Sequence, residues 1–250
     1  MYNTILITGA SSGIGKALAE HYAAPHITLI LVGRDKKRLQ DSQELCEGKG
    51  ATVVSKTIDV TDQSAMEKWI NEIDKAHPID LVIANAGVRA MQRDPDREEY
   101  NRVLKTNIDG VLNAVWPVML RMKERKTGHI AVLSSLAAYR GFPKRGAYCA
   151  SKAAIKMLCE CWRIELEPYN IVVSTICPGF IKTPLTAGSK LKMPFIMEVD
   201  DAAKRIAKGL ATKKAVIAFP TPVFLFVRFL QCLPVAISDY LVRRASRKVK

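Results

Sequence analysis

The fold is decided by residues 4–15, which read Thr4-Ile5-Leu6-Ile7-Thr8-Gly9-Ala10-Ser11-Ser12-Gly13-Ile14-Gly15. The first four form a continuous apolar run, which is typical of a central parallel strand covered on both faces. The glycines that follow permit a tight turn and let the backbone approach a pyrophosphate, whose charge then lies at the amino end of a helix beginning near Gly13. Apolar residues then recur at helical spacing, at Ile14, Ala17, Leu18 and Tyr22. A buried strand, a glycine turn and an amphipathic helix together predict a dinucleotide-binding unit.

The composition indicates one large α/β domain. The chain has 250 residues, 48% of them hydrophobic, which is enough for a substantial core. Residues 1–220 contain no repeated, low-complexity or Pro/Gly/Ser-rich stretch that would mark a linker. We therefore expect a single domain over residues 1–220, followed by an extension over residues 221–250.

The first residues and the cysteines predict a cytoplasmic protein. Residues 1–7 enter a strand-like run at once and lack the basic flank and apolar core of a signal peptide. The six cysteines show neither a disulfide framework nor paired Cys-x-x-Cys spacing, so we expect reduced thiols and no metal site. The net charge of +14 is compatible with nucleic acid, an anionic membrane or an acidic ligand. Because no basic motif is interleaved with aromatic residues, we expect no nucleic-acid partner.

Strand-like runs alternate with helical segments along the rest of the chain. They lie at residues 27–32, 52–54, 81–83, 129–133, 171–176 and 216–219. This alternation predicts a doubly wound parallel sheet, the Rossmann fold, in which ligands bind at the carboxyl ends of the strands. The small and polar residues that follow the runs are therefore candidate site residues: Gly33-Arg34, Asp59-Val60, Ala84-Asn85-Ala86-Gly87, Ser134-Ser135 and Pro178-Gly179.

Arg34 bears on the choice of cofactor. A guanidinium at the end of the second strand can pair with a 2′-phosphate, which favours NADP over NAD. Alternatively, Arg34 is a surface residue at the start of a helix that Asp35 caps.

Tyr148 and Lys152 are a candidate acid–base pair. They are four residues apart, so on a helix both side chains leave the same face. A cation about 5 Å away, at an effective dielectric of about 20, favours phenolate by roughly 3 kcal/mol, or about two pKa units. The same spacing is also common on solvated helix faces. Another helix, expected over residues 97–126, places Asn107 among apolar neighbours, where it either kinks the helix or serves a buried polar network.

With these segments in order, the chain resembles the short-chain dehydrogenase/reductase family in its common form of this length. The resemblance covers residues 3–219, including the thirteen-residue step from Ser135 to Tyr148. It rests on the residues 8–15, Asp59-Val60, Asn85-Ala86-Gly87, Asn107, Ser135, Tyr148-Cys149-Ala150-Ser151-Lys152, Pro178-Gly179 and Thr183.

The resemblance implies a role for each catalytic residue. Tyr148 would give a proton to the substrate oxygen in reduction and remove it in oxidation. Lys152 would lower the pKa of Tyr148 and bind the nicotinamide ribose. Ser135, rather than its neighbour Ser134, would hold the substrate oxygen, and Asn107 would bind the water through which protons reach Lys152.

The resemblance also implies a cofactor site, with NADP, as NADPH in the reduction, preferred to NAD. Two departures from the family pattern bear on it: Ser12 stands where many NADP-preferring members carry a second basic residue, and Ala84 replaces the first Asn of Asn-Asn-Ala-Gly. The implied cofactor-binding residues are Gly9, Ser11, Ser12, Gly13, Ile14, Gly15, Arg34, Asp59, Val60, Asn85, Ala86, Gly87, Tyr148, Lys152, Pro178, Gly179, Ile181 and Thr183.

Residues 184–199 fall where the family places a mobile segment over the substrate. Their apolar side chains suggest a lid for an apolar substrate, although they could equally cap the core or line a subunit contact. These side chains are Leu191, Met193, Phe195, Ile196 and Met197.

The extension over residues 221–250 is apolar first and basic later. We expect no membrane-spanning helix here, because the stretch is interrupted by Pro220, Pro222, Pro234 and Arg228. An apolar helix followed by a cationic one is the composition of an interfacial membrane anchor, whereas the alternative is a helix packed on the body or on another subunit with a solvated basic tail. The basic residues are Arg243, Arg244, Arg247, Lys248 and Lys250.

Together these features predict an NADP-dependent oxidoreductase that interconverts a secondary alcohol and a ketone, with a lipophilic small-molecule substrate. The alternative is a non-catalytic protein of the same fold that binds a nucleotide and senses redox state or scaffolds a complex. Family habit implies a homodimer or homotetramer. The extension would add contact with an anionic membrane surface, at the inner face of a membrane.

Overall fold

A parallel β-sheet forms the centre of the computed structural model, which describes residues 2–91, 95–187 and 193–247, with the backbone alone for 245–247. Within these residues the sheet has seven strands in the order β3-β2-β1-β4-β5-β6-β7. The chain order reverses on either side of β1, which makes the carboxyl ends of β1 and β4 the place where this fold binds ligands. The predicted doubly wound parallel sheet is confirmed. The strands are β1 (Thr4–Thr8), β2 (Thr28–Gly33), β3 (Thr52–Thr57), β4 (Leu81–Ala84), β5 (Gly128–Leu133), β6 (Ile171–Pro178) and β7 (Val216–Phe219).

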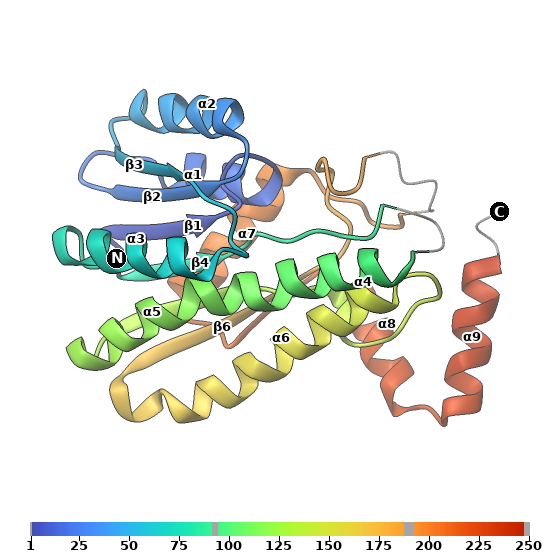
Figure 1. Ribbon diagram of the computed structural model, residues 1–250. Coiled ribbons are helices and arrows are strands. Elements are labelled where there is room, and N and C mark those ends of the chain that lie inside the picture. The colour runs from blue at the N-terminus through green and yellow to red at the C-terminus, as the bar shows by residue number, and fades with distance from the viewer. Residues whose placement is uncertain (1, 92–94, 188–192, 248–250) are drawn as a thin grey trace.

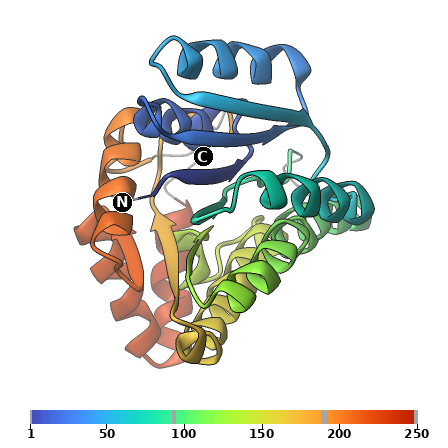
Figure 2. The same cartoon turned by 90° about the vertical axis from the view of Figure 1, so that its left-hand side faces the viewer.

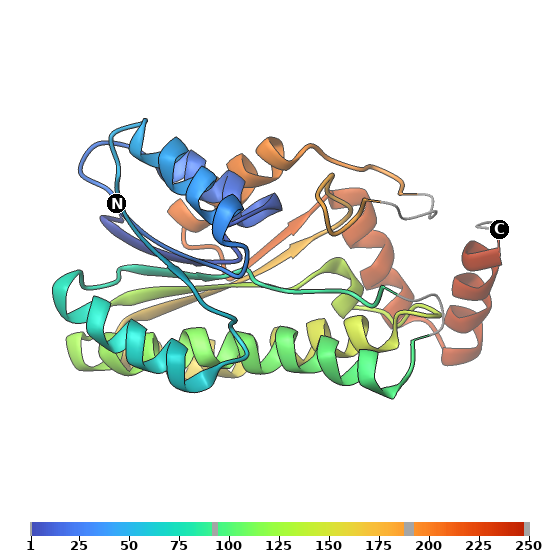
Figure 3. The ribbon, with the colours of Figure 1, turned by 45° about the horizontal axis from the view of Figure 1, so that its top comes forward.

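Helices cover both faces of the sheet. α1, α2 and α7 lie on one face and α3, α5 and α6 on the other (Figure 3). Seen from its end, the sheet twists, with β3 and α2 at the top (Figure 2). The helices are α1 (Gly13–Tyr22), α2 (Lys36–Glu47), α3 (Gln63–Ala76), α4 (Arg97–Leu104), α5 (Gly110–Arg125), α6 (Gly146–Glu165), α7 (Val199–Ala211), α8 (Thr221–Cys232) and α9 (Val235–Arg247), with 3₁₀ turns η2 (Leu136–Ala138) and η3 (Glu167–Tyr169).

The two cores follow from the alternation of side chains along each strand. Leu6 packs into the cluster beneath α3, α5 and α6, whereas Ile5 and Ile7 pack into the cluster beneath α1, α2 and α7. All three are fully buried, and each contributes about 1.5–3 kcal/mol. This double burial explains why β1 reads as a continuous apolar run.

The expected helix over residues 97–126 is interrupted. α4 ends at Leu104, a π-helical turn η1 (Lys105–Asp109) follows, and α5 begins at Gly110. Asn107 lies in this turn and is fully buried, with its side chain hydrogen-bonded to Val88 and Ser151. Both outcomes expected of Asn107, a local break in the helix and a buried polar network, therefore occur together.

The extension forms two helices beside the carboxyl ends of the strands. α8 follows β7 directly, and α9 lies beyond it at the right-hand edge of the molecule (Figure 1). Val227 of α8 packs against Leu136 and Cys177, next to the end of β5 and β6. Asp239 of α9 forms an ion pair with Arg140, which follows η2. The extension is thus attached to the segment that carries Ser135.

Candidate active site

The glycine turn closes tightly onto the end of β4. Gly9 and Gly13 have φ of 67° and 54°, the left-handed region that favours glycine. A Cβ on Gly15 would lie 2.3 Å from the carbonyl oxygen of Gly9, and a Cβ on Gly9 would lie 2.8 Å from Nδ2 of Asn85. Asn85 Nδ2 donates to Thr8 O at 2.9 Å. The turn therefore has room for backbone alone, as a close approach to a pyrophosphate requires.

The amino end of α1 lies between the end of β2 and the segment before the lid. Ser12 is the N-cap residue, and its side chain makes no cap hydrogen bond. Ser11 lies beside Gly33, where an added Cβ would approach Ser11 Oγ to 3.1 Å, and Gly13 faces the Thr183 side chain at 3.3 Å. The first N–H groups of a helix lack intrahelical partners, so this end of α1 can receive a phosphate.

Arg34 and Asp59 meet beyond the carboxyl ends of β2 and β3. Arg34 Nη1 lies 3.4 Å from Asp59 Oδ2, and the Arg34 side chain is 57% exposed. Burial alone would raise the pKa of Asp59, but hydrogen bonds from Thr61 and the charge of Arg34 outweigh it and lower that pKa. Asp35 accepts a hydrogen bond from Arg38 N and is the N-cap of α2, so the capping role considered for Asp35 is real. A loose pair with one carboxylate leaves most Arg34 donors available.

Val60, Ile181 and the β6 terminus form the apolar walls of the site. The Val60 side chain is buried against Gly110 of α5, so only its backbone can face a ligand. Ile181 is also buried. At the end of β6, Pro178 is followed by Gly179, whose N–H donates to Phe219 O at 2.7 Å. Of the predicted cofactor residues, Ala86 is held by a hydrogen bond from its N–H to Thr8 Oγ1, and Ile14 is half-buried.

Lys152 is buried at the centre of the site. Its Nζ donates to Leu133 O at 2.7 Å and lies 5.9 Å from the ring centroid of Tyr148. Burial lowers the pKa of Lys152 from 10.5 to about 8. A Cβ on Gly87 would lie 3.4 Å from Lys152 Nζ and 3.2 Å from Asn107 Oδ1, so both polar groups converge on this glycine.

Tyr148 lies close enough to Ser135 for the two side chains to interact. Burial raises the pKa of Tyr148, and neither the interaction with Ser135 nor the nearby charge of Arg145 offsets that effect. In the protein without cofactor the expected lowering of this pKa by Lys152 is not found, because burial has the larger effect.

The two adjacent serines have different surroundings. Ser134 Oγ donates to Lys152 O at 2.7 Å and holds the backbone of α6. Ser135 Oγ accepts from Ala137 N at 3.1 Å and contacts Pro178 O at 3.5 Å. Only Ser135 is directed to Tyr148.

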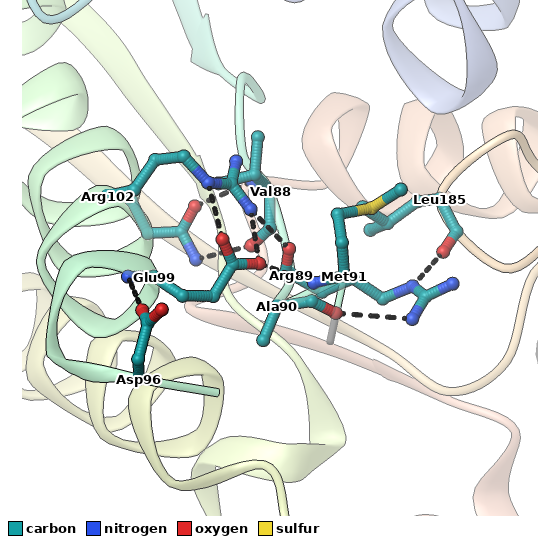
Figure 4. Close-up of polar contacts among 9 residues, drawn as sticks. Val88, Arg89, Ala90, Met91, Asp96, Glu99, Arg102 and Leu185 are labelled. Carbon is teal, nitrogen blue, oxygen red and sulfur yellow. Dashed lines mark hydrogen bonds and ion pairs between the residues drawn. The ribbon is translucent and has the colours of Figure 1, made fainter. Parts of the chain in front are cut away.

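Arg89 and Arg102, which the sequence patterns did not single out, connect the segment after β4 to the first residues of the lid. Arg89 Nε donates to Leu185 O at 2.5 Å (Figure 4). Arg102 of α4 donates to Arg89 O at 3.0 Å and pairs with Glu99, which also accepts from Met91 N (Figure 4). In the sequence, only the position of Arg89, two residues after the candidate site residue Gly87, indicated that Arg89 lies near the site.

The lid is described in part. Residues 188–192, including Leu191, lie outside the described residues. Of the other predicted side chains, Phe195 and Ile196 are exposed, Met193 is half-buried, and Met197 packs against the core while its backbone bridges to Ile181. One of the lid side chains thus caps the core, and two remain available to a ligand or partner.

Comparisons with known proteins agree with this geometry. The family model described as short chain dehydrogenase matches residues 3–193. An uncharacterized oxidoreductase of Myxococcus xanthus is 36% identical over 247 residues, covering 97% of each chain. A short-chain dehydrogenase from Sphingobium yanoikuyae, solved in complex with NADPH, has a TM-score of 0.80 and 28% identity over 87% of this chain and 88% of that one. One from Mycobacterium paratuberculosis, bound to NAD, has a TM-score of 0.78 and 26% identity over 86% and 94%.

The chain therefore belongs to the short-chain dehydrogenase/reductase family. It is accordingly an oxidoreductase of a class that uses NAD or NADP. The glycine turn, the open amino end of α1 and the exposed Arg34 fit such a dinucleotide.

Proposed function

We propose that this oxidoreductase interconverts a secondary alcohol and a ketone and prefers NADP. The observation that carries the proposal is the grouping of the Tyr148 phenol, the Ser135 hydroxyl that acts on its pKa, and the buried ammonium of Lys152, whose Nζ lies 5.9 Å from the centroid of the Tyr148 ring. These groups lie at the carboxyl ends of β5 and β6, where this fold binds ligands.

Ser135 and Tyr148 present two hydroxyl groups that can both hydrogen-bond one substrate oxygen. Tyr148 holds its proton at neutral pH because burial raises its pKa, and it donates that proton to the oxygen as the ketone is reduced. When bound, the nicotinamide supplies or accepts hydride. Lys152, with a pKa of about 8, exchanges protons near neutrality, and Asn107 lies where it can hold a water on that route.

Replacing Tyr148 with Phe tests the proposal. Turnover should fall by about a hundredfold or more, while the affinity for NADPH stays nearly unchanged. Retained turnover would reject Tyr148 as the acid. If the wild-type protein binds NADPH tightly but oxidises none of it across a broad panel of carbonyl compounds, the redox sensor or scaffold is supported instead.

The preference for NADP rests on Arg34. Its guanidinium is exposed and makes one long contact with Asp59. A 2′-phosphate would gain charge-assisted hydrogen bonds there. Arg34→Ala should therefore raise the Kd for NADPH by about tenfold or more and leave that for NADH nearly unchanged. An equal effect on both cofactors would refute the preference.

The substrate is proposed to carry an apolar portion. Phe195 and Ile196 are exposed on the segment that follows Ile181 and Thr183, so they can cover a ligand there. A screen of NADPH oxidation over ketones of graded chain length and ring number tests this. If kcat/KM does not rise with apolar size, the lid does not select for it.

The extension is proposed to contact an anionic membrane surface, at the inner face of a membrane. None of the helices in the described ranges combines the length and apolar character needed to cross a bilayer. The outer face of α8 exposes one apolar stripe, and α9 exposes another group, which is more apolar surface than a monomer normally leaves open. The exposed apolar residues are Leu225, Phe226, Phe229, Val235, Ile237 and Tyr240.

The charge of this surface favours an anionic bilayer over a second copy of the chain. Arg228, Arg243 and Arg244 are exposed, and Asp239 is engaged with Arg140. Lys248 and Lys250 lie outside the described residues, as does the Arg247 side chain. The full-length variant Leu225→Ser/Phe229→Ser should sediment less with phosphatidylglycerol vesicles than the wild type. Equal partitioning would reject the surface.

A homodimer or homotetramer is proposed to form through α5 and α6. These helices lie side by side (Figure 1), and their outer faces expose Trp116, Leu120, Met157 and Ile164. Light scattering of Ile164→Glu tests this, because a carboxylate in an apolar interface should shift the protein towards monomer. An unchanged mass would exclude this face.

A further inference from the structure

Arg145 lies immediately before α6, three residues ahead of Tyr148. It is the N-cap residue of that helix, and its side chain makes no cap hydrogen bond. Its backbone is fixed, because Arg145 N donates to Phe142 O at 3.2 Å and Arg145 O accepts from Cys149 N at 2.9 Å. The side chain is part-buried. Arg145 is the N-cap residue and Tyr148 the third residue of α6, so the two are neighbours at the amino end of the helix, and the charge of Arg145 acts on the phenol.

The guanidinium of Arg145 has no hydrogen-bond or ion-pair partner among the described residues. By contrast, the other arginines around the site each have a hydrogen-bond or ion-pair partner. Arg102 pairs with Glu99, Arg140 pairs with Asp239, and Arg89 donates to the carbonyl oxygens of Leu185, Ala187 and Ala90. Arg145 therefore carries five donors in a fork that nothing in the described chain engages.

The surroundings of Arg145 make this cation costly. Burial lowers its pKa, Cys149 and Tyr148 act in the opposite direction, and the charge of Arg89 lowers it further. No carboxylate of the described residues contributes to that balance. A partly desolvated charge next to a like charge is unfavourable unless an anion joins it.

Two simpler roles do not use the guanidinium. A helix cap would need a hydrogen-bond acceptor at the amino end of α6, and a cation there is repelled by the helix dipole. Arg145 does lower the pKa of Tyr148, but that effect requires only its charge. A phosphate of the dinucleotide is also excluded, because the glycine turn and Arg34 lie on the other side of the site, at α1 and β2.

We propose that Arg145 binds a carboxylate of the substrate, close to the carbonyl group on which Tyr148 acts. A carboxylate matches the planar fork of one guanidinium, whereas a phosphate dianion would need a second free cation, and Arg89 is held by the lid carbonyls. Arg145 and Tyr148 are neighbours at the amino end of α6, so a carboxylate held by Arg145 would lie a few bonds from the carbonyl. Together with the apolar lid, this defines an amphiphilic oxo acid. The inference rests on the proposed function.

The test compares a γ-keto acid with its neutral ester. Wild type, Arg145→Gln, Arg145→Lys and the neighbouring surface control Lys144→Gln are assayed for NADPH oxidation with levulinate and γ-oxodecanoate and with their methyl esters. The acid-to-ester ratio of kcat/KM should be about tenfold to a hundredfold in the wild type, near one in Arg145→Gln, and partly retained in Arg145→Lys. Any effect of Arg145 on the Tyr148 proton acts on both substrates and cancels in the ratio.

A second measurement does not depend on turnover. Calorimetric titration of the NADPH-loaded protein with decanoate and with decanol should show tighter binding of the carboxylate, lost in Arg145→Gln and kept in Lys144→Gln. A wild-type ratio near one, or the same carboxylate preference in Arg145→Gln, would overturn the proposal. If no ketone is reduced but decanoate still binds through Arg145, the proposed reaction fails while the carboxylate site stands.

Discussion

The buried ammonium of Lys152 should make the stability of the protein without cofactor depend on pH in a defined way. The pKa of Lys152 is about 8 in the folded protein and 10.5 ordinarily, so between these values the unfolded chain binds more protons than the folded one. Stability must then rise with pH over that window. Below pH 8 the folded protein carries the full penalty, which is roughly 3 kcal/mol.

Most of this change in the free energy of unfolding can be measured between pH 7 and pH 9.5. Over that range the linkage integral for Lys152 is about 2 kcal/mol in favour of the folded state at the higher pH. Tyr148, whose pKa burial raises, is present in both the wild type and a Lys152 variant, so its own contribution cancels in their comparison. Lys152→Met removes the titrating group, and its loss of the bond to Leu133 O adds an offset that is largely independent of pH.

Urea unfolding of wild type and Lys152→Met at the two pH values provides the assay. The stability of the wild type relative to the variant should increase by about 2 kcal/mol from pH 7 to pH 9.5. Titrations common to both proteins cancel in this difference. Lys208→Met, which replaces an exposed lysine at the end of α7, should show no such change. A change of less than about 0.5 kcal/mol for Lys152→Met would refute the buried charge.

Three further substitutions follow from the packing. Gly15→Ala places a Cβ 2.3 Å from a backbone oxygen, so the affinity for NADPH, measured by fluorescence titration, should fall at least about tenfold. The control Gly141→Ala meets nothing within 4 Å and should bind NADPH normally. Equal affinities of the two variants would contradict the tight turn. Asn107→Ala removes hydrogen bonds to Val88 N, Val88 O and Ser151 Oγ and should cost about 2–3 kcal/mol in urea unfolding. A loss below about 1 kcal/mol would argue against the network. Asp74→Ala leaves Arg125 without its carboxylate partner and should lower the free energy of unfolding by about 3–5 kcal/mol in the same assay. An unaltered urea midpoint would contradict this expectation.

Local patterns were sufficient to predict the sheet. The inner strands are covered by helices on both faces, so they read as apolar runs, whereas the edge strand β3 is only partly buried. The expected strands agree with the observed ones to within a few residues. The candidate residues at the strand ends gather at one edge because parallel strands share their direction. Asn107 could also be singled out from the sequence, because an amide among apolar neighbours needs hydrogen-bond partners when it is buried.

Contacts between distant segments were not predictable from spacing. The helical step from Tyr148 to Lys152 is as expected, but the ammonium bonds a carbonyl at the end of β5, which no local pattern indicates. Burial in the assembled fold then raises the pKa of Tyr148 rather than lowering it. The bond from Arg89 to Leu185 joins positions 96 residues apart and depends on the tertiary structure alone.

The direction of the strands has a practical consequence for handling the protein. The chain enters the sheet at Thr4, at the edge opposite the active site, whereas α9 ends on the same side as the lid and the segment after β4 (Figure 1). An affinity tag or a surface linkage placed before residue 1 therefore keeps the substrate entrance and the apolar faces of α8 and α9 clear. The same attachment after residue 250 would crowd both, so vesicle-binding and kinetic experiments call for amino-terminal fusions.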